Sequence, residues 1–118
     1  MTPDELRART KSFALRVVRL YRTLPRSADA QVMGKQLLRC GTSVAANYRA
    51  SCRARSRAEF AARIGVVVEE ADETGFWMEM LVDAEIVRVA LLKDLLQESK
   101  ELTAIFTATQ QSTRKKNW

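Results

Sequence analysis

The chain has 118 residues, with 20 Lys or Arg against 14 Asp or Glu, no histidine and a formal net charge of +6. This length suits one domain with one core, here expected over residues 1–118. The absence of histidine removes the usual general base at neutral pH, and no nucleophile or phosphate-loop motif replaces it. Four Gly and two Pro are too few for the turns of an all-β chain. We therefore expect a helical, non-enzymatic domain.

The first helix is expected over Pro3–Leu24. Thr2 supplies a capping hydroxyl, Pro3 occupies the first helical position, and Glu5 follows three residues after the cap. Its apolar positions step by multiples of three and four until Pro25, and they are Leu6, Phe13, Val17, Leu20 and Leu24.

The second helix is expected over Asp29–Arg55, with Ser27 or Asp29 as its cap. Its stripe comprises Met33, Leu37, Cys40, Val44, Asn47 and Ser51. Asn47 would then be a polar residue in the core stripe, where such a residue can set register and partner choice.

An uncharged stretch runs from Cys40 to Tyr48 within this helix. A helix with one solvated face normally carries charges there, so we expect another subunit to cover this face. The candidates for close contact between subunits are Gly41, Ser43 and Ala46. The alternative is a small Ser/Thr/Ala face that is simply exposed to water.

The two cysteines, Cys40 and Cys52, lie twelve positions apart on this helix, a separation of about 18 Å. They therefore cannot form a disulfide with each other. Neither a paired Cys-x2-Cys motif nor a histidine is present, so we expect no metal and no other cofactor. Reduced cysteines, no leader sequence and no apolar run of about 20 residues indicate a cytoplasmic protein without a membrane partner.

The third helix is expected over Arg57–Val82, opened by a capping box between Ser56 and Glu59. Its seam keeps a seven-residue repeat through Phe60, Ile64, Val67, Ala71, Thr74, Met78 and Leu81. The helix is densely acidic. Because bundle metal sites use Glu-x-x-His, we expect glutamates such as Glu69 and Glu73 to face Arg39 or Asn47 instead.

The fourth helix is expected over Val89–Thr113, with Leu92, Leu95, Leu102 and Phe106 on its apolar side. The tail 114–118 joins cations to Trp118, which suits either a basic helix end or an aromatic that stacks on a base. Four such stripes joined by short connections predict an antiparallel, up-down-up-down four-helix bundle.

Charge is uneven along the chain. Residues 1–58 hold 13 basic and 3 acidic residues, a net of +10, whereas residues 59–118 hold 7 basic and 11 acidic ones. Phosphate backbones bind to clustered Lys and Arg without sequence specificity. The candidate nucleic-acid contacts are Arg9, Arg16, Arg19, Arg49, Arg53, Arg55 and Arg57. The same polarity could instead join the basic surface of one copy to the acidic surface of the next.

Several motifs between positions 36 and 77 resemble those of one bacterial family. They read Gln-Leu-Leu-Arg, Thr-Ser-Val, Ala-Asn-Tyr, Arg-Ala-Arg-Ser-Arg-Ala-Glu-Phe and Glu-Thr-Gly-Phe-Trp. The chain resembles the four-helix-bundle proteins encoded in intervening sequences of 23S rRNA genes, and their relatives, the accessory proteins of diversity-generating retroelements. The similarity runs from about Phe13 to Thr113.

The resemblance implies a four-helix bundle that assembles into a homopentameric ring. It also implies RNA or DNA, a reverse transcriptase or another protein as a partner. Two functions remain open: an oligomeric scaffold that binds RNA or an RNA–protein complex, and a structural or protein-interaction ring whose charges serve assembly only.

Overall fold

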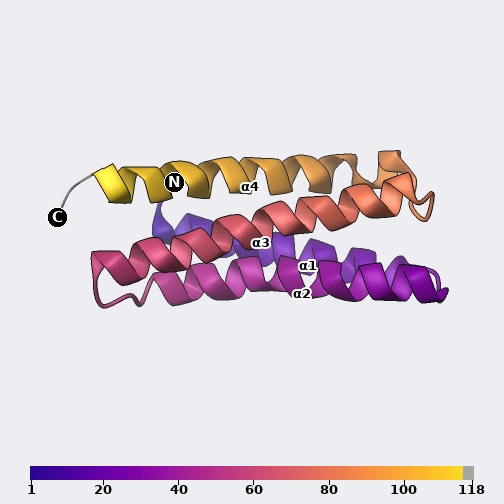
Figure 1. The fold of residues 1–118 in the computed structure, drawn as a ribbon, viewed down its shortest axis with the longest axis horizontal. Helices are drawn as coiled ribbons and strands as arrows, with labels where there is room; N and C mark the ends of the chain where they lie inside the picture. The colour runs from indigo at the N-terminus through magenta and orange to yellow at the C-terminus, as the bar shows by residue number, and fades with distance from the viewer. Residues whose placement is uncertain (116–118) are drawn as a thin grey trace.

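The computed structural model describes residues 1–115 and contains four long helices in an antiparallel, up-down-up-down bundle (Figure 1). The helices are α1 (Pro3–Thr23), α2 (Ala28–Ser51), α3 (Arg57–Asp83) and α4 (Val89–Lys115). The predicted all-α bundle is confirmed, with no strand within residues 1–115. Lys116, Asn117 and Trp118 of the predicted tail lie outside the described residues.

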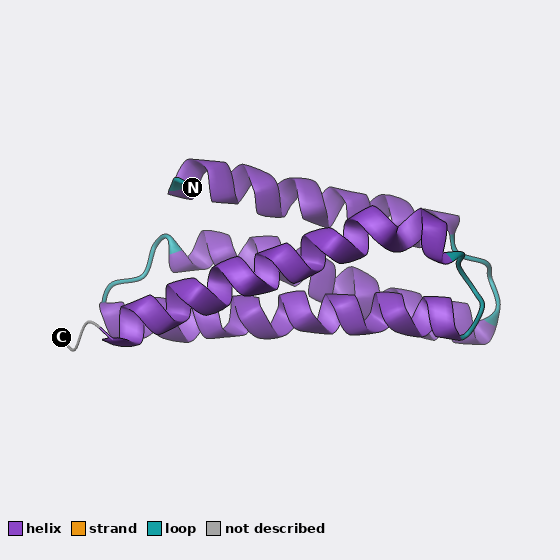
Figure 2. Ribbon diagram, turned by 90° about the horizontal axis from the view of Figure 1, so that it is seen from above, coloured by secondary structure: helices purple, strands orange, loops and turns teal. Residues whose placement is uncertain are grey.

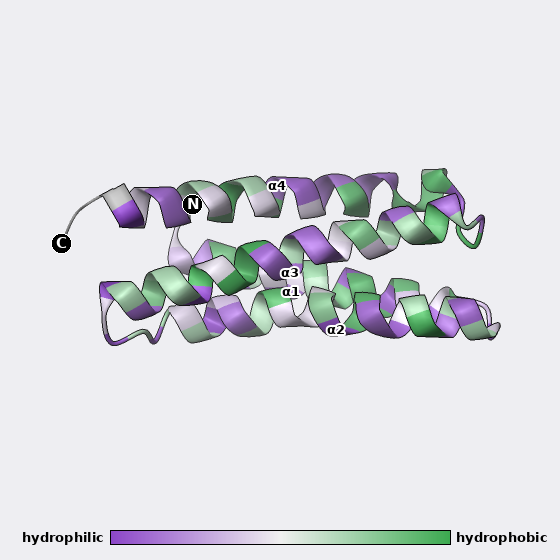
Figure 3. Ribbon diagram, in the orientation of Figure 1, coloured by the Kyte–Doolittle hydropathy of each residue, from purple (hydrophilic) through white to green (hydrophobic). Residues whose placement is uncertain are grey.

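The core contains most of the predicted apolar seams. Every predicted seam position of α4 is buried, and so is every one of α3 except the half-buried Phe60. Figure 3 shows hydrophobic and hydrophilic residues alternating along each helix, as burial of one side requires.

The predicted stripe of α2 was wrong at Asn47. This residue is only half-buried, and its side chain donates to the carbonyl of Ser43 in its own helix at 2.9 Å. Tyr48 takes the core position instead and packs on Phe106 with ring centroids 5.1 Å apart. The larger apolar ring gains more from burial than the amide does, so the stripe passes through position 48 instead of 47, while Val44 and Ser51 are buried as predicted.

The capping box at Thr2 is confirmed, with Glu5 N–H donating to the Thr2 hydroxyl at 3.1 Å and Thr2 N–H donating to the Glu5 carboxylate at 3.2 Å. At α3, only half of the predicted box forms. Ser56 accepts from the Glu59 N–H at 3.0 Å, but the Glu59 carboxylate accepts from Arg55 N–H rather than from Ser56.

The α2 helix ends four residues before its predicted end at Arg55. Ser56 caps α3 in an extended conformation, with φ of −151°, so a helix cannot run through it. Residues 52–56 therefore form the connection that carries the chain across to α3. This places the arginines of the predicted cluster partly on helices and partly on a loop.

Contacts between neighbouring helices are unequal. Gly41 brings α2 close to α1, because a Cβ at this position would lie 2.7 to 3.0 Å from three side-chain atoms of Val17. By contrast, α1 contacts α4 over a much shorter stretch than it contacts α2. Figure 2 shows the helices running along the long axis, with their connections at the two ends. The bundle measures 49 × 22 × 20 Å.

Candidate nucleic-acid interface

A hollow on the described surface, with a volume of about 680 Å³, lies between α1 and α2. Arg7 and Lys11 line it from α1, Arg49 lines it from the C-terminal end of α2, and Arg53 lines it from the connection that follows. Because the two helices are antiparallel, the start of α1 lies beside the end of α2. Four cations therefore converge on one groove whose remaining walls include Ala45, a small uncharged residue.

A second hollow, of about 420 Å³, lies on the other side of α2, facing α3. Arg55 from the connection and Arg63 from α3 line it together with Arg49 and Arg53. We use the name basic cluster for the cations that line either hollow: Arg7, Lys11, Arg49, Arg53, Arg55 and Arg63.

Four arginines of the basic cluster have no carboxylate within ion-pairing distance in residues 1–115: Arg49, Arg53, Arg55 and Arg63. One carboxylate, that of Glu59, lines the second hollow, where it accepts the backbone N–H of Arg55 at 3.0 Å. Arg7 forms an exposed ion pair with Asp4, one turn away on α1. The cluster thus presents positive charge that the described part of the chain leaves largely uncompensated.

Arg9 does not belong to this cluster. Its guanidinium donates to both carboxylate oxygens of Glu98, each at 2.7 Å, and to Glu101 at 3.0 Å. The hydrogen bonds to Glu98 raise the pKa of Arg9. Arg9 therefore ties α1 to α4 and is already neutralised, which removes it from the predicted phosphate contacts.

The other predicted contacts of α1 also lie away from the two hollows. Arg16 is half-buried and Arg19 is exposed, and both lie in the C-terminal half of α1. Arg57, the first residue of α3, lines a further hollow of about 530 Å³ at the end of the bundle, beside Phe60.

Sequence reasoning missed Arg7, Lys11 and Arg63 as members of the cluster. Each is far in sequence from the arginine run at 49–57, and only the pairing of α1 and α3 with α2 brings them together. Arg7 and Lys11 are four positions apart on α1, so they share one helical face, whereas Arg53 follows the end of α2. That four-residue spacing was the sequence signal that could have identified Arg7 and Lys11 as a pair of neighbouring cations.

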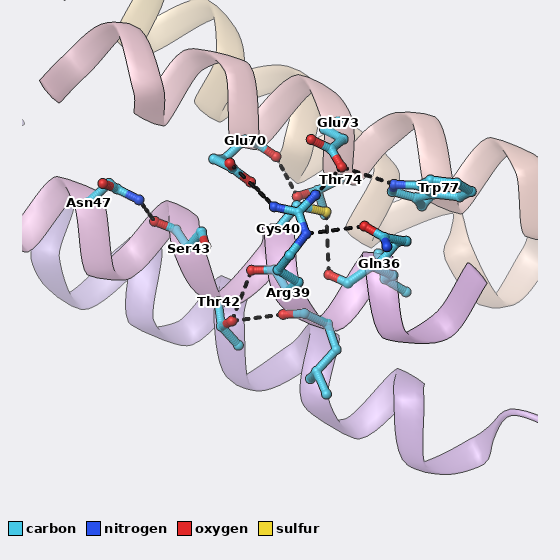
Figure 4. A network of polar contacts seen from close by, with 12 residues as sticks. Gln36, Arg39, Cys40, Thr42, Ser43, Asn47, Glu70, Glu73, Thr74 and Trp77 are labelled. Atoms are coloured by element: carbon cyan, nitrogen blue, oxygen red, sulfur yellow. Dashed lines mark hydrogen bonds and ion pairs between the residues drawn. The ribbon is translucent and has the colours of Figure 1, made fainter. Parts of the chain in front are cut away.

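A second polar group joins α2 to α3 (Figure 4). Arg39 pairs with Glu70, Nη1 to Oε2 at 3.3 Å, and with Glu73. Glu73 also accepts the indole N–H of Trp77 at 3.2 Å. Burial raises the pKa of the Glu70 carboxyl, although Arg39 acts in the opposite direction. The arrangement is structural, because every charged group in it has a partner.

The expected pairing of Arg39 with acidic residues of α3 is thus present for Glu73. Glu69 is exposed and makes no ion pair within the described residues. Glu70 pairs with Arg39 in its place. One residue of register separates the two glutamates, which is 100° around the helix. Asn47 faces none of these carboxylates, since its amide bonds to its own helix.

The three predicted interface residues lie in different environments. Gly41 is buried against Val17 within the same chain, so its lack of a side chain serves the α1–α2 contact. Ser43 is half-buried, and Ala46 is exposed on the outer side of α2, where it lines both hollows. Gly41 therefore serves a contact within the chain, and its predicted place in the subunit interface is corrected. Ala46 is accessible to a partner.

Both cysteines are free, with Cys40 buried and Cys52 exposed beside the basic cluster. Within residues 1–115, no three His, Cys, Asp or Glu side chains lie in positions to hold a metal ion. In the same part of the chain, no helix has the length and apolar character to cross a membrane.

The fold and this surface define a class, the small all-α bundles with an arginine-rich face. The chain belongs to the family of 23S rRNA-intervening sequence proteins, whose family model matches residues 5–108. The resemblance found in the sequence is confirmed for this family, and a relation to the retroelement accessory proteins stays a prediction.

Among solved structures, the chain is similar to a protein of unknown function from the S23 ribosomal protein family of Bacteroides thetaiotaomicron VPI-5482. The two are 32% identical, with a TM-score of 0.86, and the similarity covers 94% of this chain and 99% of that one. No curated protein matches the chain.

Proposed function

We propose that this chain is a non-enzymatic scaffold that binds RNA, or an RNA–protein complex, through phosphate contacts at the basic cluster. The observation that carries the proposal is a set of four arginines that have no carboxylate partner within residues 1–115 and come from two helices and a loop. The fold neutralises arginines elsewhere, as at Arg9 and Arg39. At the basic cluster the fold leaves four arginines without a neutralising carboxylate in the described residues, and such a surface suits a polyanion.

Binding at this surface is independent of base sequence. Side chains that line the two hollows are cationic, small or hydroxyl-bearing, apart from Cys52 and Glu59. Base readout relies on bidentate Arg, Asn or Gln contacts held in a defined geometry against base edges. Long, exposed arginines with no partner to orient them favour phosphate contacts instead.

Replacing Arg49, Arg53 and Arg63 together by glutamine should weaken binding to an unrelated RNA by at least about tenfold at physiological salt. Fluorescence anisotropy over a salt series measures this, and the slope of log affinity against log salt should become shallower. The replaced residues are exposed and make no ion pair in residues 1–115, so the fold should be unaffected.

The matched control replaces Arg26, Lys35 and Lys93 by glutamine, which removes the same charge from exposed positions outside the cluster. If the control loses as much affinity as the cluster variant, net charge and not this surface determines binding. A parent protein that binds no RNA at low salt would refute the proposal.

A second candidate function is a protein-interaction ring, a homopentamer if the family resemblance extends to assembly. One observation favours it. On the outer part of α2, Thr42 donates to the carbonyl of Leu38 at 2.7 Å and Asn47 donates to that of Ser43. Covering this face would leave those polar groups paired, which keeps the desolvation cost low.

Ala46→Arg separates the two candidates. If α2 binds RNA, the new cation lies between the two hollows and should raise RNA affinity about threefold, without changing the molecular mass in solution. Analytical ultracentrifugation and the anisotropy titration measure both quantities. A parent that sediments as an oligomer and a variant that sediments as a monomer would instead establish Ala46 in a subunit interface.

A further inference from the structure

The two hollows form one continuous surface. Ala46, Arg49 and Arg53 line both of them, so the groove facing α1 and the groove facing α3 meet across the outside of α2. Lys11 lies only in the first groove and Arg63 only in the second. A polyanion that contacts every cation of the basic cluster must therefore pass over α2 from one side to the other.

Small and cationic side chains meet at the crossing point. Ala46 is exposed and lines both grooves together with Arg49 and Arg53, and the half-buried Ala50 lines the second groove only. Arg49 lies in the last turn of α2, and Arg53 lies in the connection that follows this helix. Cations thus stand at the crossing itself, beside the small side chain of Ala46.

The width of α2 limits which nucleic acid can follow both grooves. An α-helix with its side chains is about 10 to 12 Å wide. A ligand in both grooves must bend within that width, whereas a DNA duplex has a persistence length of about 50 nm. A double helix is too stiff to enter both grooves, but a single strand can turn at each nucleotide.

We infer that the basic cluster takes single-stranded nucleic acid, along a track that runs from Lys11 over Ala46 and Ala50 to Arg63. The inference rests on the proposed function and adds the class of ligand. Electrostatics alone would favour a duplex, because its two strands carry more charge per length. A preference for a single strand would therefore reflect the shape of the track.

The test compares a fluorescein-labelled oligouridylate with a mixed-sequence RNA duplex of the same length, titrated with the full chain. We expect the single strand to bind at least about tenfold more tightly at physiological salt. Six phosphate contacts would give a slope of about −4 for the single strand in a plot of log affinity against log salt.

Two single substitutions test the path itself. Lys11→Gln and Arg63→Gln should each lower affinity for the oligouridylate about threefold, because one strand contacts both grooves. Lys35→Gln, an exposed lysine outside the cluster, should leave it unchanged. A strand confined to one groove would respond to only one of the two changes, which would overturn the track.

The outcomes for the track and for the proposed function are distinguishable. If the duplex binds as tightly as the single strand, the inference is wrong and RNA binding at the basic cluster stands. If neither probe binds at low salt, the proposed function and the inference are both wrong.

Discussion

Gly41→Val should lower the free energy of unfolding by about 3 kcal/mol, near the upper end of overpacking effects. A Cβ at Gly41 would meet Cγ1, Cγ2 and Cβ of Val17 at 2.7, 2.8 and 3.0 Å. A valine in a helix is fixed in one rotamer, so Val17 cannot swing aside, and α1 must move away from α2. Urea unfolding followed by circular dichroism measures the loss.

Gly34→Ala is the matched control. There the nearest obstacle is Cδ1 of Leu24, at 2.6 Å, the far end of a side chain that can rotate, and the Tyr21 ring at 3.1 to 3.2 Å needs to move by only a few tenths of an ångström. The gain in helix propensity, about 1 kcal/mol, offsets the local crowding, so stability should change little. Adding Val17→Ala to Gly41→Val should recover part of the loss. If Gly41→Val were as stable as the parent, the close contact between α1 and α2 would be refuted.

Arg9→Met should cost about 2 kcal/mol, because Glu98 would lose both of its hydrogen bonds to the guanidinium in a partly buried site. The side chains of Arg9 and Glu98 are 24% and 16% exposed, so water screens the pair only in part. Hydrogen exchange should show faster opening of α1, since the contact between α1 and α4 is short.

Arg7→Met provides the comparison, as its ion pair with Asp4 is exposed and local to α1. That change should cost less than about 0.5 kcal/mol. Combining Arg9→Met with Glu98→Leu should restore part of the stability, because no unpaired carboxylate then remains. Equal losses for Arg7→Met and Arg9→Met would show that the pair between α1 and α4 contributes nothing specific.

The sequence predicted the fold and the apolar seams of α3 and α4 well, because bulky side chains at three- and four-residue steps leave one possible buried face. One position of the α2 stripe was harder to predict. Small residues from Gly41 to Ala46 give little hydrophobic contrast, and either Asn47 or Tyr48 continues the three- and four-residue steps between Val44 and Ser51. Burial of the Tyr48 ring selects position 48, a tertiary effect that periodicity alone does not contain.

The candidate site could be predicted only where its residues are close in sequence. Arg49, Arg53 and Arg55 were found because they form one run. Lys11 and Arg63 join them through the packing of three helices, and Arg9 leaves the set because Glu98, 89 positions away, pairs with it. Charge neutralisation by a distant carboxylate has no local sequence signal.

The order of helix contacts has a kinetic consequence. Each helix packs chiefly on the helices next to it in the chain, and α1 meets α4 only briefly. Most native contacts therefore close short loops, so the relative contact order is low and little chain entropy is lost before stabilising contacts form. Helical bundles of this kind fold in roughly microseconds to milliseconds. A chain emerging from the ribosome could complete the α1–α2 hairpin before α4 has been synthesised, which leaves the Arg9 ion pairs among the last contacts to form.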